Sequence, residues 1–126
     1  MPRPFVRVTL PLILWACLIM TATSIPGSPD REPFPIPEAD KAVHLLMYAG
    51  LGFLSMRRAW IVRREWSESH GSRVCFAAGA LFASLDEIHQ RFIPYRSCSA
   101  ADLMADLTGL AIGIAVVWLV PRARPS

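Results

Sequence analysis

The chain has 126 residues, of which 53% are hydrophobic and only 18% are charged. A soluble domain of this size exposes much of its surface and needs more polar residues to cover it, so the composition indicates a small membrane protein. The formal net charge is +3, but the arginines flank apolar stretches and form no patch with interleaved aromatics, which argues against nucleic-acid binding. The three cysteines show neither metal-ligand spacing nor a disulfide framework.

Four apolar stretches run along the chain, each close to the ~20 residues that a helix needs to cross a bilayer. They predict an all-α membrane protein, a four-transmembrane-helix bundle in which residues 1–126 form a single domain. The predicted spans are about 8–25, 42–60, 74–93 and 103–120. The first stretch, preceded by Arg3 and Arg7, also resembles a signal peptide, but its apolar run is long for that role.

The basic residues indicate the orientation of the bundle. Nine of the 13 lysines and arginines lie inside if the N-terminus is cytoplasmic, so the positive-inside rule predicts that both termini are cytoplasmic. The outer loop after the first span carries five prolines between Pro26 and Pro37 and is expected to be extended. The inner loop around Trp60 and Trp66 is interpreted as a topology anchor, with an interfacial amphipathic helix as the alternative.

Polar residues gather at one end of the predicted bundle. They open the second span, close the third and open the fourth, and the predicted topology places these three ends at the outer leaflet. They are Asp40, Lys41, His44, Asp86, Glu87, His89, Gln90, Arg91, Asp102 and Asp106, with Arg96 in the short outer loop. Because an aspartate at mid-membrane costs about 2.5–3.5 kcal/mol on insertion scales, such residues are expected to face the bundle interior and to find partners there.

Helical spacing defines the inward face of the fourth span. Asp102 and Asp106 are four residues apart, so they share a face, and Gly109 and Gly113 continue the same stripe. Glycines at this spacing form a small-xxx-small pattern that lets another helix approach closely. We therefore expect the carboxylate face of the fourth span to pack into the bundle.

Three segments that carry these polar residues resemble a known family. The segments "DKAVH", "DEIHQRFIPYRS" and "DLMADLTGLAIG" occur in the order and spacing of the VanZ-like family of small bacterial membrane proteins, over roughly residues 38–115. The positions that match the family pattern are Asp40, Lys41, His44, Glu87, Gln90, Arg96, Asp102 and Gly109. Two positions depart from it: Asp106 stands where the family often has asparagine, and Tyr95 where it often has a glycine before the arginine. The first adds a charge, and the second bears on the tight turn before Arg96.

The resemblance implies a multi-pass helical protein of the bacterial inner (cell) membrane. The founding member of the family is associated with resistance to the glycopeptide teicoplanin by a mechanism that is not established. Such a resemblance implies that the protein acts in the cell envelope. A link to envelope or glycopeptide-antibiotic phenotypes is one expectation. The resemblance does not identify a reaction.

Two functions from different classes remain open. The first is an integral membrane protein whose polar outer-leaflet site binds an envelope component without catalysis. The alternative is a membrane enzyme acting on a phosphorylated lipid or lipid-linked headgroup, in which carboxylates and a histidine serve as acid, base or ligands. Proton-coupled transport is weaker, because the inner halves of the spans offer no polar path.

The candidate site residues come from all three polar segments. The candidate catalytic or ligand cluster is Glu87, His44 and Asp102; the candidate substrate-binding residues are Arg96, Lys41 and Gln90; the candidate metal ligands are Asp86 and Asp106; the structural pair is Gly109 and Gly113. A divalent cation is the candidate cofactor, and the expected partners are membrane lipids and a lipid-linked or envelope substrate. We expect Glu87, Arg96 and Asp102 to lie within side-chain reach of one another, with Arg96 as the counter-ion and His44 approaching from the second span.

Overall fold

The computed structural model describes residues 2–27, 39–96 and 99–121, and most of these residues are helical. The all-α class and the four long helices are as predicted. The first long helix is built from α1 (Pro2–Pro4), a π-helical segment (Phe5–Thr9) and α2 (Leu10–Ser24). The others are α3 (Ala39–Val62), α4 (Glu68–Gln90) and α5 (Ala100–Leu119). Most of the proline-rich loop expected to be extended lies outside the described residues.

Two serines determine where the last two helices begin. Ser67 Oγ accepts a hydrogen bond from the backbone N–H of His70 at 3.2 Å, and Ser99 Oγ accepts one from the backbone N–H of Asp102 at 3.4 Å. These caps satisfy amide groups that have no carbonyl partner within the first turn. Both helices therefore begin before their apolar stretches, which alone suggested residues 74 and 103 as the starts.

The connection between α3 and α4 is a short turn over residues 63–67. Trp60 belongs to α3, whereas Trp66 lies in the turn, where its ring meets His70 edge-on with centroids 5.0 Å apart. The Arg63 guanidinium stacks over the same indole, 5.5 Å from its centroid. The alternative prediction of an interfacial helix around the two tryptophans is therefore wrong, because residues up to Val62 belong to α3.

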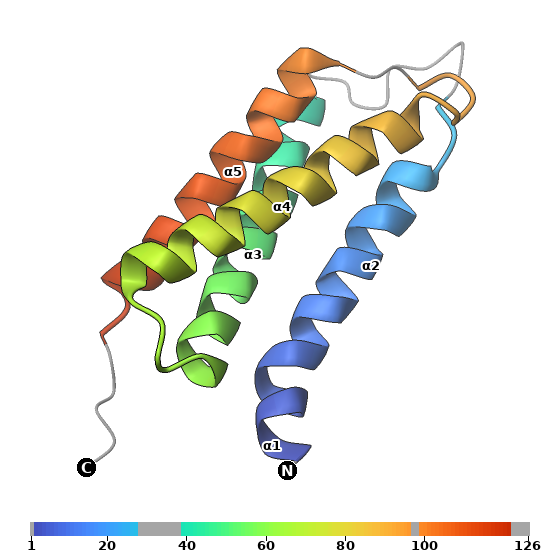
Figure 1. The fold of residues 1–126 in the computed structure, drawn as a ribbon. Coiled ribbons are helices and arrows are strands. Elements are labelled where there is room, and N and C mark those ends of the chain that lie inside the picture. The colour runs from blue at the N-terminus through green and yellow to red at the C-terminus, as the bar shows by residue number, and fades with distance from the viewer. Residues whose placement is uncertain (1, 28–38, 97–98, 122–126) are drawn as a thin grey trace.

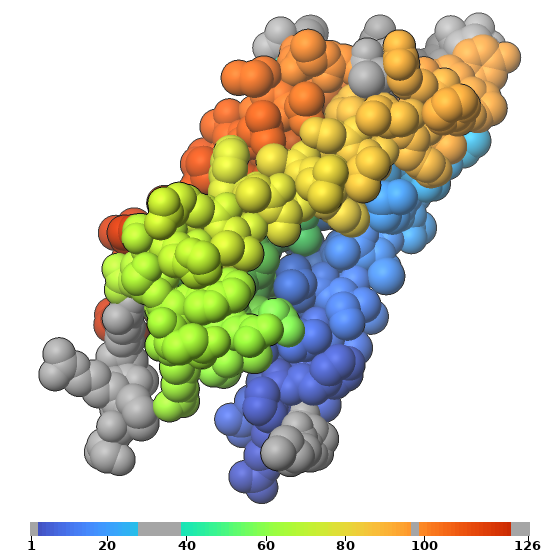
Figure 2. Space-filling model, in the orientation of Figure 1, coloured from blue at the N-terminus to red at the C-terminus, as the bar shows by residue number. Residues whose placement is uncertain are grey.

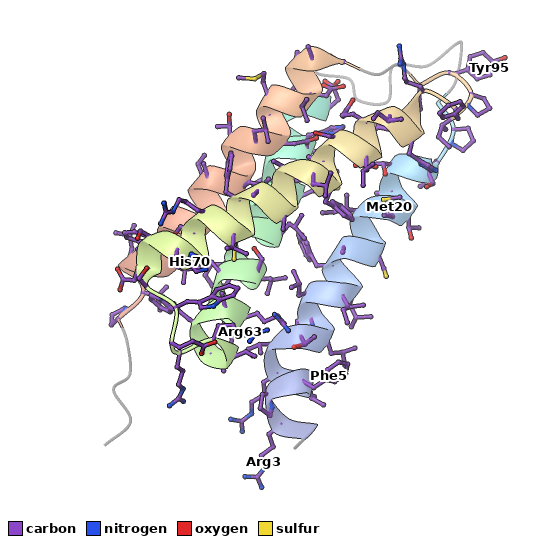
Figure 3. The ribbon with its side chains drawn as sticks, in the orientation of Figure 1. Arg3, Phe5, Met20, Arg63, His70 and Tyr95 are labelled. Atoms are coloured by element: carbon purple, nitrogen blue, oxygen red, sulfur yellow. The ribbon has the colours of Figure 1, made fainter. Side chains whose placement is uncertain are left out.

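The helices alternate in direction, so the two ends of the bundle carry different connections. Figure 1 shows that α1 begins and α5 ends at the same end as the α3–α4 turn, which we call the turn end. At the opposite end, which we call the loop end, α2 and α4 finish and α3 and α5 begin. Tyr95 marks the loop end in Figure 3, whereas Arg3, Arg63 and His70 lie towards the turn end.

The pair α3 and α5 forms the most extensive helix contact. Gly109 and Gly113 of α5 lie against the backbone of α3, and Gly52 of α3 lies against the backbone of α5 at Leu110. A Cβ at any of these three glycines would meet main-chain atoms, which cannot move aside as the end of a flexible side chain can. The glycines thus allow the two backbones to touch, in the way that small residues do between membrane helices.

A tryptophan in the middle of the first long helix ties it to α3. Trp15 Nε1 donates a hydrogen bond of 2.7 Å to the carbonyl oxygen of Met47, and its ring packs over Gly50. Trp15 lies in the middle of its helix, away from the ends at which the tryptophans of membrane helices are enriched. Its place is explained by this inter-helix hydrogen bond, which an interfacial position would not allow.

At the loop end the bundle is polar inside and apolar outside. On α4, Leu81, Leu85 and Ile88 are 50–63% exposed, whereas Asp86 and Glu87 are at most 2% exposed. In the space-filling view α4 covers the middle of this face, with α2 and α5 along its sides (Figure 2). Soluble helices show the reverse pattern, and helices surrounded by lipid show this one.

Two of the described helices are long and apolar enough to cross a membrane, the segments Phe5–Ser24 and Ala100–Leu119. The other two long helices, α3 and α4, carry charged residues near both of their ends. The structure thus shows the four helices, and the prediction that all four cross the membrane with cytoplasmic termini is taken up below as a proposal.

Candidate functional site

A histidine and an aspartate form the centre of the candidate site. His44, in the second turn of α3, donates from Nδ1 to Oδ1 of Asp106, in the second turn of α5, at 2.8 Å. Their exposed fractions are 5% and 0%. The close approach of α3 and α5 at Gly109, one turn further along, brings these two side chains together.

Glu87 joins the pair from α4. Its Oε1 lies 4.0 Å from His44 Nδ1 and accepts a hydrogen bond from Gln90 Nε2 at 3.3 Å. Its Oε2 accepts a hydrogen bond of 3.2 Å from the backbone N–H of Ser99, the residue that caps α5. The N-cap of α5 therefore fixes the orientation of a carboxylate that belongs to α4.

Asp102 completes what we call the acid–histidine cluster, which consists of His44, Glu87, Asp102 and Asp106. Asp102 lies one turn before Asp106 on the same face of α5 and close enough to His44 and Glu87 to interact with both electrostatically. Within the described part of the chain, Asp102 Oδ1 and Asp106 Oδ2 are buried and have no hydrogen-bond partner. Buried carboxylate oxygens normally have donors, so these two are open to a ligand.

Asp86 lies beside the cluster and has a different role. Its Oδ1 accepts a hydrogen bond of 2.6 Å from Thr23 Oγ1, and its Oδ2 accepts one of 2.9 Å from Tyr48 OH. A single carboxylate thereby joins α2, α3 and α4. Both of its oxygens accept hydrogen bonds from hydroxyl groups, and Asp86 is not among the three residues whose ligand atoms converge, His44, Glu87 and Asp106.

The expectation that Arg96 pairs with the carboxylates is wrong. Its Nε donates to the carbonyl oxygen of Ile25 at 3.0 Å, and one terminal nitrogen donates to that of Ala22 at 3.4 Å. The last carbonyls of a helix have no intrahelical donor, and Arg96 supplies donors to those of α2. The arginine thus holds the end of the first long helix against the α4–α5 link, and its assignment to substrate binding stays a prediction.

The turn before Arg96 forms although it lacks the glycine typical of the VanZ-like pattern. Tyr95 adopts a φ of 60°, in the left-handed region that costs a non-glycine residue roughly 1–2 kcal/mol. The backbone N–H of Gly27 donates to the carbonyl oxygen of Pro94 at 3.0 Å, and Gly27 packs directly on the carbonyl of Tyr95. This contact with the segment that follows α2 stabilises the strained turn.

Of the other predicted site residues, Gln90 is buried and takes part only through its hydrogen bond to Glu87. Lys41 is half-buried in the first turn of α3, and its proposed contact with a substrate stays a prediction. His89 Nδ1 is buried and lacks a hydrogen-bond partner within the described residues.

Sequence reasoning missed three residues that organise this end of the bundle: Thr23, Tyr48 and Ser99. A signal for Tyr48 was present, because it follows His44 by four residues and so continues the same face of α3. Thr23 and Ser99 lie in segments whose contacts depend on how distant helices pack, and no local spacing indicates them.

The chain was compared with models of known protein families. The model of the VanZ/LLP1 family matches residues 8–121 of the chain. The chain belongs to the VanZ/LLP1 family. The VanZ/LLP1 match includes every residue of the acid–histidine cluster and confirms the resemblance based on the three sequence blocks. No curated protein and no solved structure matches the chain, so roles for the individual residues rest on the geometry.

Proposed function

We propose that this chain is a multi-pass protein of the bacterial inner membrane in which all four long helices cross the bilayer, with both termini in the cytoplasm. At the loop end of α4 the charged residues are buried and the leucines face outward, which supports a lipid environment for this helix. Its composition alone is too polar to identify it as a membrane span. The turn end carries Arg63 and Arg64, and the N-terminal helix adds Arg3 and Arg7 there. A basic turn end is the one that the positive-inside rule assigns to the cytoplasm.

In this orientation the acid–histidine cluster lies within the outer-leaflet half of the membrane. We infer that the cluster binds the polar headgroup of a lipid or lipid-linked component of the cell envelope. The observation that carries this inference is the pair of buried acceptors without donors, Asp102 Oδ1 and Asp106 Oδ2. A site built only to hold the helices together would pair these oxygens, as the hydroxyl groups pair both oxygens of Asp86.

Lipid retention tests this function. The protein is extracted from native membranes into nanodiscs, and the lipids bound to it are identified by native mass spectrometry for the wild type and for Glu87→Gln. We expect the wild type to retain a lipid species that Glu87→Gln loses. Glu65→Gln is the matched control, since it changes an exposed glutamate at the turn end. An identical set of bound lipids in the wild type and Glu87→Gln would remove the proposal.

A membrane enzyme that acts on a phosphorylated lipid or lipid-linked headgroup is the second candidate. It is favoured by the 2.8 Å contact between His44 and Asp106, since an imidazole oriented by a carboxylate is a common general base. Phosphate release from a phosphorylated polyprenol or from phosphatidate would be compared for the wild type and His44→Gln. Release that requires His44 would support the enzyme, and no release from either substrate by the wild type would count against it.

Family membership supports a further proposal, that the protein affects the response of the envelope to glycopeptide antibiotics. We expect a deletion strain to change its susceptibility to teicoplanin and to regain the original value when it expresses the wild type but not Glu87→Gln. Equal susceptibility of the deletion strain and its parent would contradict this link.

A further inference from the structure

The convergence of ligand atoms in the acid–histidine cluster leads to an inference that rests on the proposed headgroup site and deepens it. His44, Glu87 and Asp106 each offer one ligand atom, and these atoms lie within 4.8 Å of one another. They come from α3, α4 and α5, so folding of the bundle brings them together. All three side chains are buried.

An acidic cluster alone does not make a metal site, and here the unpaired oxygens supply the second observation. Asp106 is 0% exposed, yet its Oδ2 has no hydrogen-bond partner within the described residues. Asp102 contributes a second such oxygen, one turn away on the same helix. A cation held by the three converging side chains would satisfy the unpaired oxygen of Asp106.

The charge balance points the same way. The cluster holds three carboxylates and one imidazole, and no lysine or arginine of the described residues forms an ion pair with it. The expected counter-ion, Arg96, instead donates hydrogen bonds to the carbonyl oxygens of Ala22 and Ile25 at the end of α2. Several buried carboxylates without a counter-ion are unfavourable, and a metal ion is one of the groups that compensate them.

We propose that the cluster binds one divalent first-row transition-metal ion through His44 Nδ1 and carboxylate oxygens of Glu87 and Asp106, with Asp102 as a further ligand. On binding the metal, Nδ1 releases to solvent the proton that it donates to Asp106 in the metal-free protein. The donor set determines the class of metal, because an imidazole nitrogen favours zinc and its neighbours over magnesium and calcium, whose sites are built from oxygen. Ser99 and Gln90 hold Glu87 by hydrogen bonds, as second-shell groups hold ligands at metal sites. The ion would offset most of the negative charge of the carboxylates and would offer a Lewis-acidic centre to which a phosphate oxygen of a headgroup could bind.

Cobalt titration tests the proposal on the full chain. Metal-free protein in nanodiscs is titrated with Co²⁺, and its visible absorption is recorded. We expect one Co²⁺ per protein, with displacement by Zn²⁺ but not by a large excess of Mg²⁺. The variants His44→Gln and Asp106→Asn should weaken the affinity at least about 10-fold. His70→Ala is the matched control, because it removes an exposed imidazole at the turn end and should leave the titration unchanged.

If these variants do not fold, a measurement on the wild type still tests whether His44 binds the metal. Pulsed electron paramagnetic resonance of bound Mn²⁺ should show coupling to one imidazole nitrogen, and this signal should persist in His70→Ala. The metal site would be refuted by a wild type that binds neither Co²⁺ nor Mn²⁺, or by bound Mn²⁺ without nitrogen coupling. Retention of the lipid by metal-free protein would then leave the headgroup site standing. Metal binding with lipids that do not respond to Glu87→Gln would instead remove the headgroup site alone.

Discussion

His44 and Asp106 lie 62 residues apart in the chain and share a buried contact of 2.8 Å between α3 and α5. Asp106 is also the position at which the VanZ-like pattern often has asparagine. An asparagine at this position would carry no charge, so this chain has a more acidic cluster than the pattern implies. The contact depends on how closely α3 and α5 approach, and that approach can be tested separately from the chemistry of the cluster.

Enlarging Gly113 should separate α3 from α5. A leucine there would meet the backbone of α3, and overpacking of this kind costs typically 1–3 kcal/mol. We expect Gly113→Leu to lower the midpoint of thermal unfolding in detergent. Ala111→Leu adds a large side chain to an exposed position of α5 and is the matched control. Equal midpoints for the two variants would show that the α3–α5 contact does not exist.

Removing the hydroxyl of Tyr48 should destabilise the bundle without touching the cluster. Tyr48→Phe leaves Asp86 Oδ2 without its donor, and a buried acceptor that loses its partner costs about 1–3 kcal/mol. Unfolding by denaturant would measure the loss. Tyr95→Phe removes the other tyrosine hydroxyl of the chain, which belongs to an exposed side chain, and should change the unfolding free energy little.

Substitutions of Tyr95 should follow backbone preference and not side-chain size. Its φ of 60° is accessible to glycine at little cost and is least favourable for a β-branched residue. We expect Tyr95→Gly to be at least as stable as the wild type and Tyr95→Val to be less stable by about 1 kcal/mol or more. The reverse order, measured by thermal unfolding, would mean that the side chain of Tyr95 determines the stability of the turn.

The helices and the polar end of the bundle follow from local features of the sequence. Apolar runs set the number of long helices, and the four-residue spacing of Asp102 and Asp106 correctly placed both on the inward face of α5. Spacing does not report the rotation of one helix relative to another. Adjacent residues of a helix differ by about 100° in direction, so Asp86 reaches the hydroxyl groups of Thr23 and Tyr48 while Glu87 faces α5.

The placement of Arg96 could not be predicted for a related reason. Charge complementarity suggested the carboxylates as its partners, but the unpaired carbonyl oxygens at the end of α2 compete for the same guanidinium. Which acceptor is within reach depends on the path of the α4–α5 link. That path depends in turn on the left-handed backbone at Tyr95. The sequence has no glycine at this position that would have predicted such a conformation.

Cysteine labelling of intact cells tests whether the acid–histidine cluster lies at the outer-leaflet end of a four-span bundle. In a background without Cys17, Cys75 and Cys98, the exposed positions Glu65 at the turn end and Ala101 at the loop end are each changed to cysteine. We expect a membrane-impermeant maleimide to label Ala101→Cys in intact cells and Glu65→Cys only after permeabilisation. Labelling of Glu65→Cys in intact cells, with Ala101→Cys protected, would place the cluster on the cytoplasmic side and refute the proposed orientation.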